Sequence, residues 1–284
     1  GSTMAQRHDH LFGDAAERDL HRTTFLEAAL SGRTGSHTWV LGTALQHEVY
    51  EGRDVPEFDF RYTTPALFVQ DEYAPAGWFT VSGSARVDRH SEFGTFVNPR
   101  LSLLLRPGEW VVRASAGTGY FGPSPFAEET EAVGLRRLAP YDDLDPERAR
   151  NAMVDIGRSI GAWELNGTVF GSEIDDALAV TVTGSGLLAL SNSTDPVRTW
   201  GTELLARYAG EPWHLSATHV YTRSRERELG ASERAEVPLA PRHTAGPALP
   251  DRLPPLPRQP PSPRPVALRA GRGRPSPRGR PSDG

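Results

Sequence analysis

One repeated unit constrains this chain more than any other feature. A short turn rich in Gly or Pro is followed by Trp, and then by a stretch in which apolar and polar residues alternate. The unit occurs at Trp39, Trp78, Trp110, Trp163 and Trp213. Alternation with a period of two places the two sets of side chains on opposite faces of a β-strand. The pattern therefore predicts a series of antiparallel hairpins.

The connections between the expected strands alternate in length. Short turns are expected near 32–36, 74–77, 106–109, 160–162 and 209–212. Longer polar connections are expected near 51–61, 90–97, 122–146, 175–195 and 226–235. Strands of roughly ten residues or more, aromatic residues beside short turns, and long loops at the other end are typical of a membrane β-barrel, which closes because lipid cannot satisfy a backbone edge. The alternative is a soluble β-sandwich-like binding module, which also alternates but usually has shorter strands.

Composition excludes several other classes of protein. The absence of Cys excludes disulfides, a thiolate zinc site and cysteine catalysis. No apolar run is long enough for a transmembrane helix, and the first residues show no secretory signal. Ser, His and Asp are scattered, and the segment 117–122 (GTGYFG) fits neither a nucleophile elbow nor a dinucleotide-binding turn. We therefore expect no enzyme, no catalytic residues and no cofactor; the remaining enzymatic alternative is a membrane-barrel enzyme with an active site formed by loop carboxylates and His90.

Charge divides the chain into two parts. The segment 241–284 holds nine Arg, two acids and 13 of the 25 Pro, whereas the preceding 240 residues hold 22 Arg and 34 acids. The C-terminal segment has no aromatic residue and cannot bury enough apolar surface to offset the entropy of ordering. We expect a β-rich region at 1–240 and a disordered Pro/Arg-rich tail at 241–284, whose sequence resembles an out-of-frame translation. No nucleic-acid partner is expected.

The stretch 85–135 resembles the barrel domain of TonB-dependent outer-membrane receptors. The residues that match motifs of that family are Arg86, Asp88, His90, Ser91, Asn98, Pro99, Arg100, Ser102, Arg113, Ser115, Gly117, Gly119, Pro123, Ser124 and Pro125. The segments 67–73 and 199–208 also look like strands of the family, so the resemblance extends over about residues 19–240.

The resemblance implies an all-β fold: an antiparallel transmembrane β-barrel portion with about 11 of an expected 22 or so strands. The expected strands are 19–31, 37–50, 62–74, 78–90, 98–106, 110–121, 147–159, 162–174, 196–209, 213–225 and 236–240. It also implies location in the outer membrane of a Gram-negative cell, contact with outer-membrane lipid, and uptake of a scarce ligand that is siderophore-like (an iron–siderophore chelate) or cobalamin-like. We expect a fragment that is inactive alone, because neither a plug domain nor a TonB-contacting segment is recognisable, and TonB would act only through the plug.

The longest expected loop, 122–146, is the candidate ligand-binding surface. Its aromatic and basic residues, with two at its base, suit an anionic aromatic chelate; they are Tyr120, Phe121, Phe126, Arg136, Arg137 and Tyr141.

The motif residues expected to be structural are Arg113, Ser115, Gly117, Gly119, Pro123 and Pro125. We expect Gly117 and Gly119 on the lumen face, where the lack of a side chain allows close approach of a plug. Arg113 is expected on the same face, paired with a carboxylate.

Two places in the sequence offer candidate metal ligands. The acids of the loop 122–146 follow no calcium-loop order. His8 and His10 could chelate a transition metal, but the sequence favours two unremarkable His residues near a chain end. No metal site is expected.

Overall fold

The computed structural model describes residues 1–12, 15–141, 143–226, 235–237 and 242–247. The strands are β1 (Ser2–Phe12), β2 (Ala15–Thr34), β3 (His37–Gly52), β4 (Phe60–Ala76), β5 (Phe79–His90), β6 (Gly94–Leu105), β7 (Trp110–Phe121), β8 (Glu147–Ile160), β9 (Trp163–Asp175), β10 (Leu178–Val182), β11 (Leu188–Asn192), β12 (Val197–Gly210), β13 (Trp213–Glu226), β14 (Ala235–Val237) and β15 (Arg242–Pro247). The helices are α1 (Glu128–Val133) and the 3-10 turns η1 (Pro56–Phe58) and η2 (Leu135–Arg137). Within these residues, no helix is both long and apolar enough to cross a membrane.

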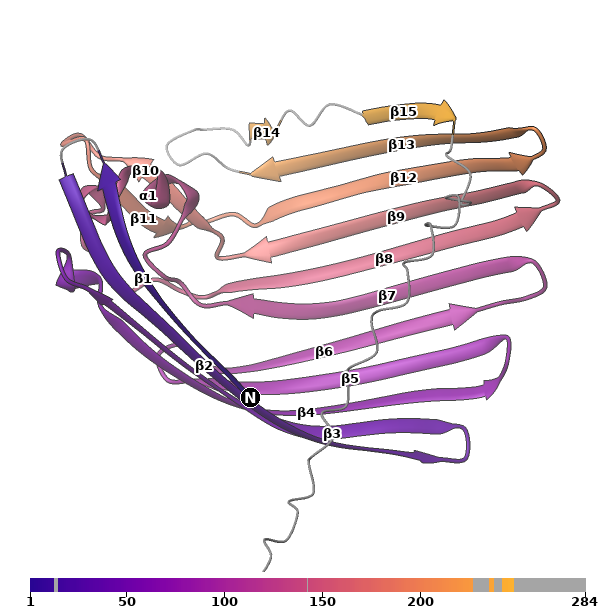
Figure 1. Ribbon diagram of the computed structural model, residues 1–284, viewed down its shortest axis with the longest axis horizontal. Coiled ribbons are helices and arrows are strands. Elements are labelled where there is room, and N and C mark those ends of the chain that lie inside the picture. The colour runs from indigo at the N-terminus through magenta and orange to yellow at the C-terminus, as the bar shows by residue number, and fades with distance from the viewer. Residues whose placement is uncertain (13–14, 142, 227–234, 238–241, 248–284) are drawn as a thin grey trace, which may run out of the picture. The chain divides into compact units, whose positions relative to one another are not determined.

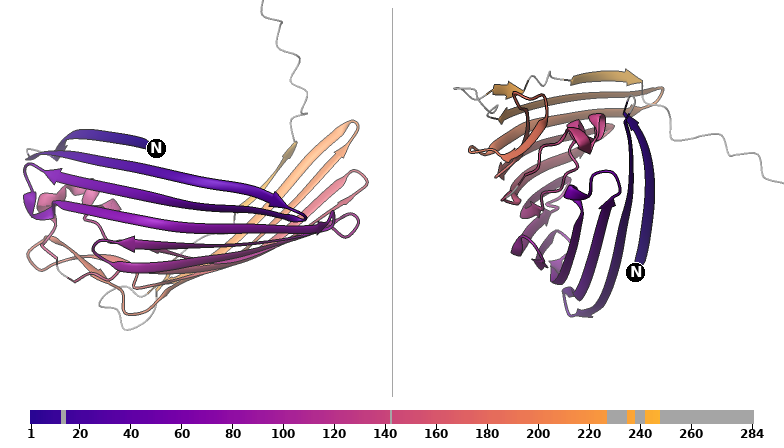
Figure 2. Two further views of the ribbon diagram at one scale, coloured as in Figure 1. Left: turned by 90° about the horizontal axis from the view of Figure 1, so that it is seen from below. Right: turned by 90° about the vertical axis from the view of Figure 1, so that its left-hand side faces the viewer.

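Thirteen of the strands form one antiparallel sheet (Figure 1). Strands β1 to β9 pair in chain order, β9 pairs with β12, and β13 pairs with β12, β14 and β15. The remaining hairpin, β10–β11, is an insertion between β9 and β12. The sheet is strongly curved (Figure 2).

The expected hairpins are confirmed, with four differences in detail. Strand β1 was not expected. The predictions of long irregular connections at 90–97 and 175–195 were wrong. The first is a tight turn between His90 and Gly94, and the second contains the β10–β11 hairpin. Strand β15 lies beyond the predicted boundary at residue 240, and residues 248–284 of the expected tail lie outside the described residues.

The two faces of the sheet differ in chemistry. The outer face exposes large apolar side chains, among them Leu30, Leu41, Leu67, Val97, Leu101, Ile156, Val169 and Leu204. The inner face carries polar groups that pair across neighbouring strands. Arg113 on β7 donates to Asp155 on β8 at 2.8 Å, and Asn166 on β9 donates to the same carboxylate at 2.6 Å. An apolar exterior with a polar interior is the arrangement that lipid outside and water inside require.

The two ends of the sheet differ in architecture. Tight turns join the strands at one end, and Trp78, Trp110, Trp163 and Trp213 stand exposed beside them. The other end carries η1, α1, η2 and the β10–β11 hairpin (Figure 1).

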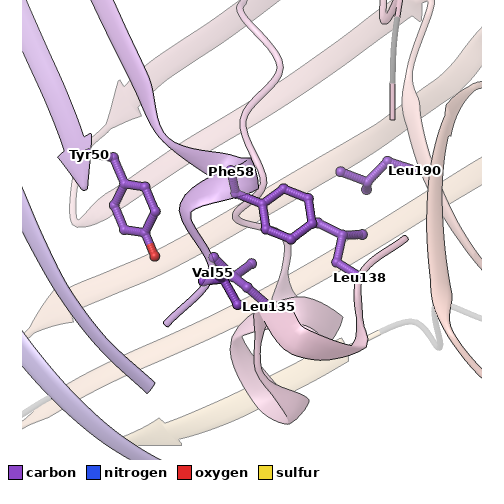
Figure 3. Packing of buried hydrophobic residues seen from close by; sticks show 6 residues of the cluster. All are labelled: Tyr50, Val55, Phe58, Leu135, Leu138 and Leu190. Carbon is purple, nitrogen blue, oxygen red and sulfur yellow. The ribbon is translucent and has the colours of Figure 1, made fainter. Parts of the chain in front are cut away.

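A small hydrophobic core joins the loops at this second end. Its buried members come from β3, from the connections 53–59 and 122–146, and from β11; they are Tyr50, Val55, Phe58, Leu135, Leu138 and Leu190 (Figure 3). We call this group the loop core. Segments far apart in the sequence are thus held together over one end of the sheet.

Candidate functional site

Two cavities meet at Tyr62 on the loop-bearing end of the sheet. The larger, of about 810 Å³, lies between β4, the β5–β6 turn and the connection 140–146; its lining includes Phe58, Arg61, Tyr62, Phe93 and Tyr141. The smaller, of about 340 Å³, is lined by β3 to β5 and the end of β7, including Tyr62, Arg86, His90, Tyr120 and Phe121. Tyr62 lines both cavities.

Packed aromatic rings, one pair of them stacked, lie where these two cavities meet. The Phe60 and Tyr62 ring centroids lie 4.6 Å apart at an interplanar angle of 16°. His90 lies 4.8 Å from Tyr62 and 4.8 Å from Phe93, again between centroids. These four residues are called the aromatic floor. Flat rings that are already packed offer a rigid apolar surface with polar edges, which suits an aromatic or metal-chelate ligand.

The loop 122–146 is attached to the sheet by carboxylates. Both oxygens of Glu17, on β2, accept backbone N–H groups, those of Leu135 and Arg136, each at 2.9 Å. Asp54 accepts from the Arg18 side chain at 3.1 Å and lies 3.6 Å from the Arg136 guanidinium. The Glu17 contacts join residues more than a hundred positions apart, and together with those of Asp54 they fix the loop against β2 and the connection that follows β3.

A buried hydroxyl organises the start of the same loop. Thr130 Oγ1 donates to the Pro125 carbonyl at 2.7 Å and accepts the Ala127 N–H at 2.8 Å. Pro123 and Pro125 are fully buried. The motif prolines therefore help to fix the path of the chain from β7 into α1.

Electrostatics of the loop region follow from these contacts. Hydrogen bonding to Arg18 lowers the pKa of the Asp54 carboxyl, so this tether stays ionised under mildly acidic conditions. Burial raises the pKa of the Tyr141 phenol to about 12, so this group is a neutral hydrogen-bonding phenol at physiological pH. The larger cavity is lined by more acids than bases: Glu57, Asp59, Glu92, Asp143 and Asp145 against Arg61.

The aromatic residues predicted to contact a ligand take different positions. Phe126 packs edge-on against Tyr50, with centroids 4.9 Å apart, and Tyr141 stacks on Phe58 at 6.0 Å. Both contribute to packing of the loop, and Tyr141 also lines the larger cavity. Tyr120 and Phe121 line the smaller cavity, where Tyr120 stacks on the buried ring of Phe96 at 3.7 Å.

The two predicted arginines are exposed. Arg136 faces Asp54, and Arg137 is the next residue along η2. The six predicted residues therefore do not form one patch, and the ligand role of each stays a prediction.

The predicted structural residues lie on β7 and just after it. Arg113 is paired with Asp155, as expected for a cation on the inner face, and Ser115 lies opposite Ser102 on β6. A Cβ on Gly117 would lie 3.3 Å from the Arg100 side chain, whereas one on Gly119 would meet open space.

Sequence reasoning missed Tyr62, Phe93, Glu17 and Asp54. Tyr62 and Phe93 lie at or near the ends of expected strands, and their aromatic side chains are the signal by which the sequence could indicate them. Glu17 and Asp54 gain their roles only when β2 and β3 pair with the observed register, because no local pattern marks either carboxylate.

A curved antiparallel sheet with an apolar outer face, a polar inner face and structured loops at one end is typical of an outer-membrane β-barrel. The family model for TonB-dependent receptor-like β-barrels matches residues 6–250, and the chain belongs to that family. This agrees with the resemblance seen in the sequence and places the chain in the outer membrane.

Individual relatives and solved structures resemble this chain only at low sequence identity. The chain is 23% identical over 249 residues to an iron-regulated outer membrane virulence protein of Vibrio cholerae, covering 80% of this chain and 38% of the relative. The siderophore receptor PirA of Pseudomonas aeruginosa superimposes with a TM-score of 0.62 at 16% identity, over 79% of this chain and 52% of PirA. The FrpB iron transporter of Neisseria meningitidis superimposes with a TM-score of 0.59 at 18% identity, over 74% of this chain and 36% of FrpB. The chain thus spans well under two thirds of the length of these proteins.

Proposed function

We propose that this chain forms part of the barrel wall of a receptor that takes up a metal chelate of the siderophore type across the outer membrane. The observation that carries the proposal is the aromatic floor beneath a cavity of about 810 Å³ at the loop-bearing end. Its size and flat rings suit a chelate, and relatives of the chain include a siderophore receptor and an iron transporter. The chain spans 38% of the Vibrio relative, and the proposal includes further strands and a plug through which TonB would act.

The charge of the cavity sharpens the class of ligand. Five carboxylate side chains line it against Arg61, and Arg136 is already engaged by Asp54. An anionic chelate would meet like charges there, whereas a neutral or cationic chelate would not. We therefore replace the anionic chelate expected from the sequence with a neutral or cationic one, such as a ferric trihydroxamate.

The chain binds its ligand without transforming it. Its family is one of receptors rather than enzymes. The sandwich-like module expected as the alternative would pack two sheets face to face, whereas thirteen of the described strands form one sheet with an apolar outer face.

Binding to the full chain in detergent micelles tests the proposal. Titration with a ferric trihydroxamate, followed by tryptophan fluorescence, should show saturable binding, and a triply anionic ferric tris-catecholate should bind more weakly. Tyr62→Ala removes a ring from the aromatic floor and should weaken trihydroxamate binding up to about tenfold, as expected for one aromatic contact.

Tyr73→Ala is the matched control. It lies on the same strand, β4, near the tight-turn end, where it stacks on His37. This variant should bind as the unmodified chain does. Absence of trihydroxamate binding, or equal binding by the Tyr62→Ala variant, would overturn the proposal.

A further inference from the structure

Two histidines and one carboxylate converge on the inner face where β1 pairs with β2. His8 Nδ1 lies 2.8 Å from Asp19 Oδ1, and His10 Nε2 lies 3.9 Å from Asp19 Oδ2. The three potential ligand atoms all lie within 4.8 Å of one another. We propose that His8, His10 and Asp19 bind a divalent transition-metal ion such as Zn²⁺.

The register of the two strands produces this arrangement. His8 and His10 are two residues apart on β1, so both side chains point to the same face. Asp19 lies directly opposite His8 in the antiparallel pair. A slip of one residue between the strands would move the carboxylate to the other face and destroy the site.

The geometry fits the coordination shell of a small borderline-soft cation. Ligand atoms about 2.0–2.1 Å from a tetrahedral Zn²⁺ lie about 3.3 Å apart. The two imidazole–carboxylate separations, 2.8 Å to one Asp19 oxygen and 3.9 Å to the other, lie on either side of that value, and the three ligand atoms all lie within 4.8 Å of one another. Rotation of the side chains would bring them to coordination distance around one ion. Two imidazoles with one carboxylate form a donor set that zinc proteins use, with water in the remaining position.

The surroundings favour a bound cation over a chance contact. The Asp19 side chain is only 10% exposed, and its ion-pair neighbours among the described residues are the two imidazoles. The three residues line a cavity of about 570 Å³ that also contains Glu17 and His21. The Glu17 carboxylate accepts backbone N–H groups, and His21 Nε2 lies 2.8 Å from a Glu48 carboxylate oxygen. These contacts hold both side chains in place beside the site.

This site is separate from the aromatic floor and does not rest on the proposed function. Its probe is Zn²⁺ alone, and its ligands are residues on which chelate binding at Tyr62 does not depend. Failure of either proposal therefore leaves the other unaffected.

Isothermal titration of the full chain in detergent with Zn²⁺ tests the inference. One ion should bind per chain. His10→Gln and Asp19→Asn should each weaken that binding at least about tenfold, because loss of a ligand costs no less than loss of an outer-shell partner. His37→Gln is the matched control: His37 lies 2.7 Å from Asp71 but belongs to a pair with a single His, so its loss should leave Zn²⁺ affinity unchanged.

Chemical protection gives a second readout that does not depend on affinity. Diethyl pyrocarbonate should modify His8 and His10 in the metal-free protein, and Zn²⁺ should slow this modification at both residues while leaving His37 reactive. The far-UV circular dichroism of each variant should match that of the unmodified chain. Zn²⁺ binding that persists in the Asp19→Asn and His10→Gln variants, or no binding to the unmodified chain, would overturn the inference.

Discussion

The two ends of this sheet are made in opposite ways. At one end, tight turns join the strands, and Trp side chains such as Trp213 stand 65% exposed. At the other, loops far apart in sequence share a buried core and are tied to the sheet by Glu17 and Asp54. In a membrane barrel, aromatic rings at the boundary settle into the lipid interface. The difference teaches that one end is built for the lipid interface, whereas the other is a packed and tethered set of loops, the surface that we propose contacts the ligand.

The largest contrast is expected from two aromatic truncations. Phe58→Ala removes a buried ring from the loop core and should destabilise loop packing by about 3–5 kcal/mol. Trp213→Ala removes an exposed ring at the other end and should change stability in detergent by no more than about 0.5 kcal/mol. Limited proteolysis should show faster cleavage within 122–146 in the Phe58→Ala variant. Equal cleavage of the two variants would show that the ends do not differ as described.

The next contrast lies on the inner face between the ends. Asp155 accepts from Arg113, Asn166 and Thr168, so Asp155→Ala leaves three donors without this acceptor and should cost about 2–3 kcal/mol. Glu164→Ala, which removes the partner of the exposed Arg207 at 3.4 Å, should cost less than about 1 kcal/mol. Thermal unfolding in detergent measures both. Similar losses would mean that the network around Asp155 adds nothing beyond one surface ion pair.

A smaller effect is expected where a ring covers the backbone. The Phe68 ring on β4 lies over Gly42 on β3, and a Cβ at Gly42 would overlap it. Gly42→Ala should therefore destabilise the sheet by about 1–2 kcal/mol through overpacking. Gly83→Ala, on β5, places its Cβ in open space and serves as the control. If the Gly42 variant unfolds at the same temperature as the Gly83 variant, the ring moves aside freely.

The smallest effect should come from pH. The pKa of Asp54 is lowered in the folded chain, so the tether to Arg18 and Arg136 stabilises the loop at every pH above the ordinary carboxyl range. That contribution is lost as pH falls through the lowered pKa. The protection factors of the loop amides against hydrogen exchange, corrected for the intrinsic pH dependence of exchange, should fall slightly at acidic pH, and Asp54→Asn should remove this change. A variant that keeps the same pH profile would place the titrating group elsewhere.

Much of the wall could be predicted from the sequence, because alternation and Gly- or Pro-rich turns are local signals. The turns before Trp110 and Trp163 define the strands on either side of them. Strand β1 escaped because its residues are mostly polar and give no apolar periodicity. The β10–β11 hairpin has a Gly-containing turn at 183–186, but its strands are short, so the sequence predicts a long loop there.

The candidate site was harder to predict for a physical reason. The sequence indicated the loop 122–146 and its aromatic residues, yet it could not show that Phe126 packs inward against Tyr50 or that Arg136 meets Asp54. Such contacts depend on which strands become neighbours and in what register. The same holds for His8 and Asp19, whose meeting is a property of the β1–β2 pairing.

The two hydrogen bonds that Glu17 accepts from the loop have a consequence for the kinetics of the proposed ligand binding. A rim held by its own backbone amides does not need to be ordered when a ligand arrives, so little of the binding free energy is lost to conformational entropy. Association should then follow a single exponential, limited by diffusion into the mouth rather than by closure of a flap. If the chain binds a chelate as proposed, selection among chelates would depend on the shape and charge of loops that are already ordered.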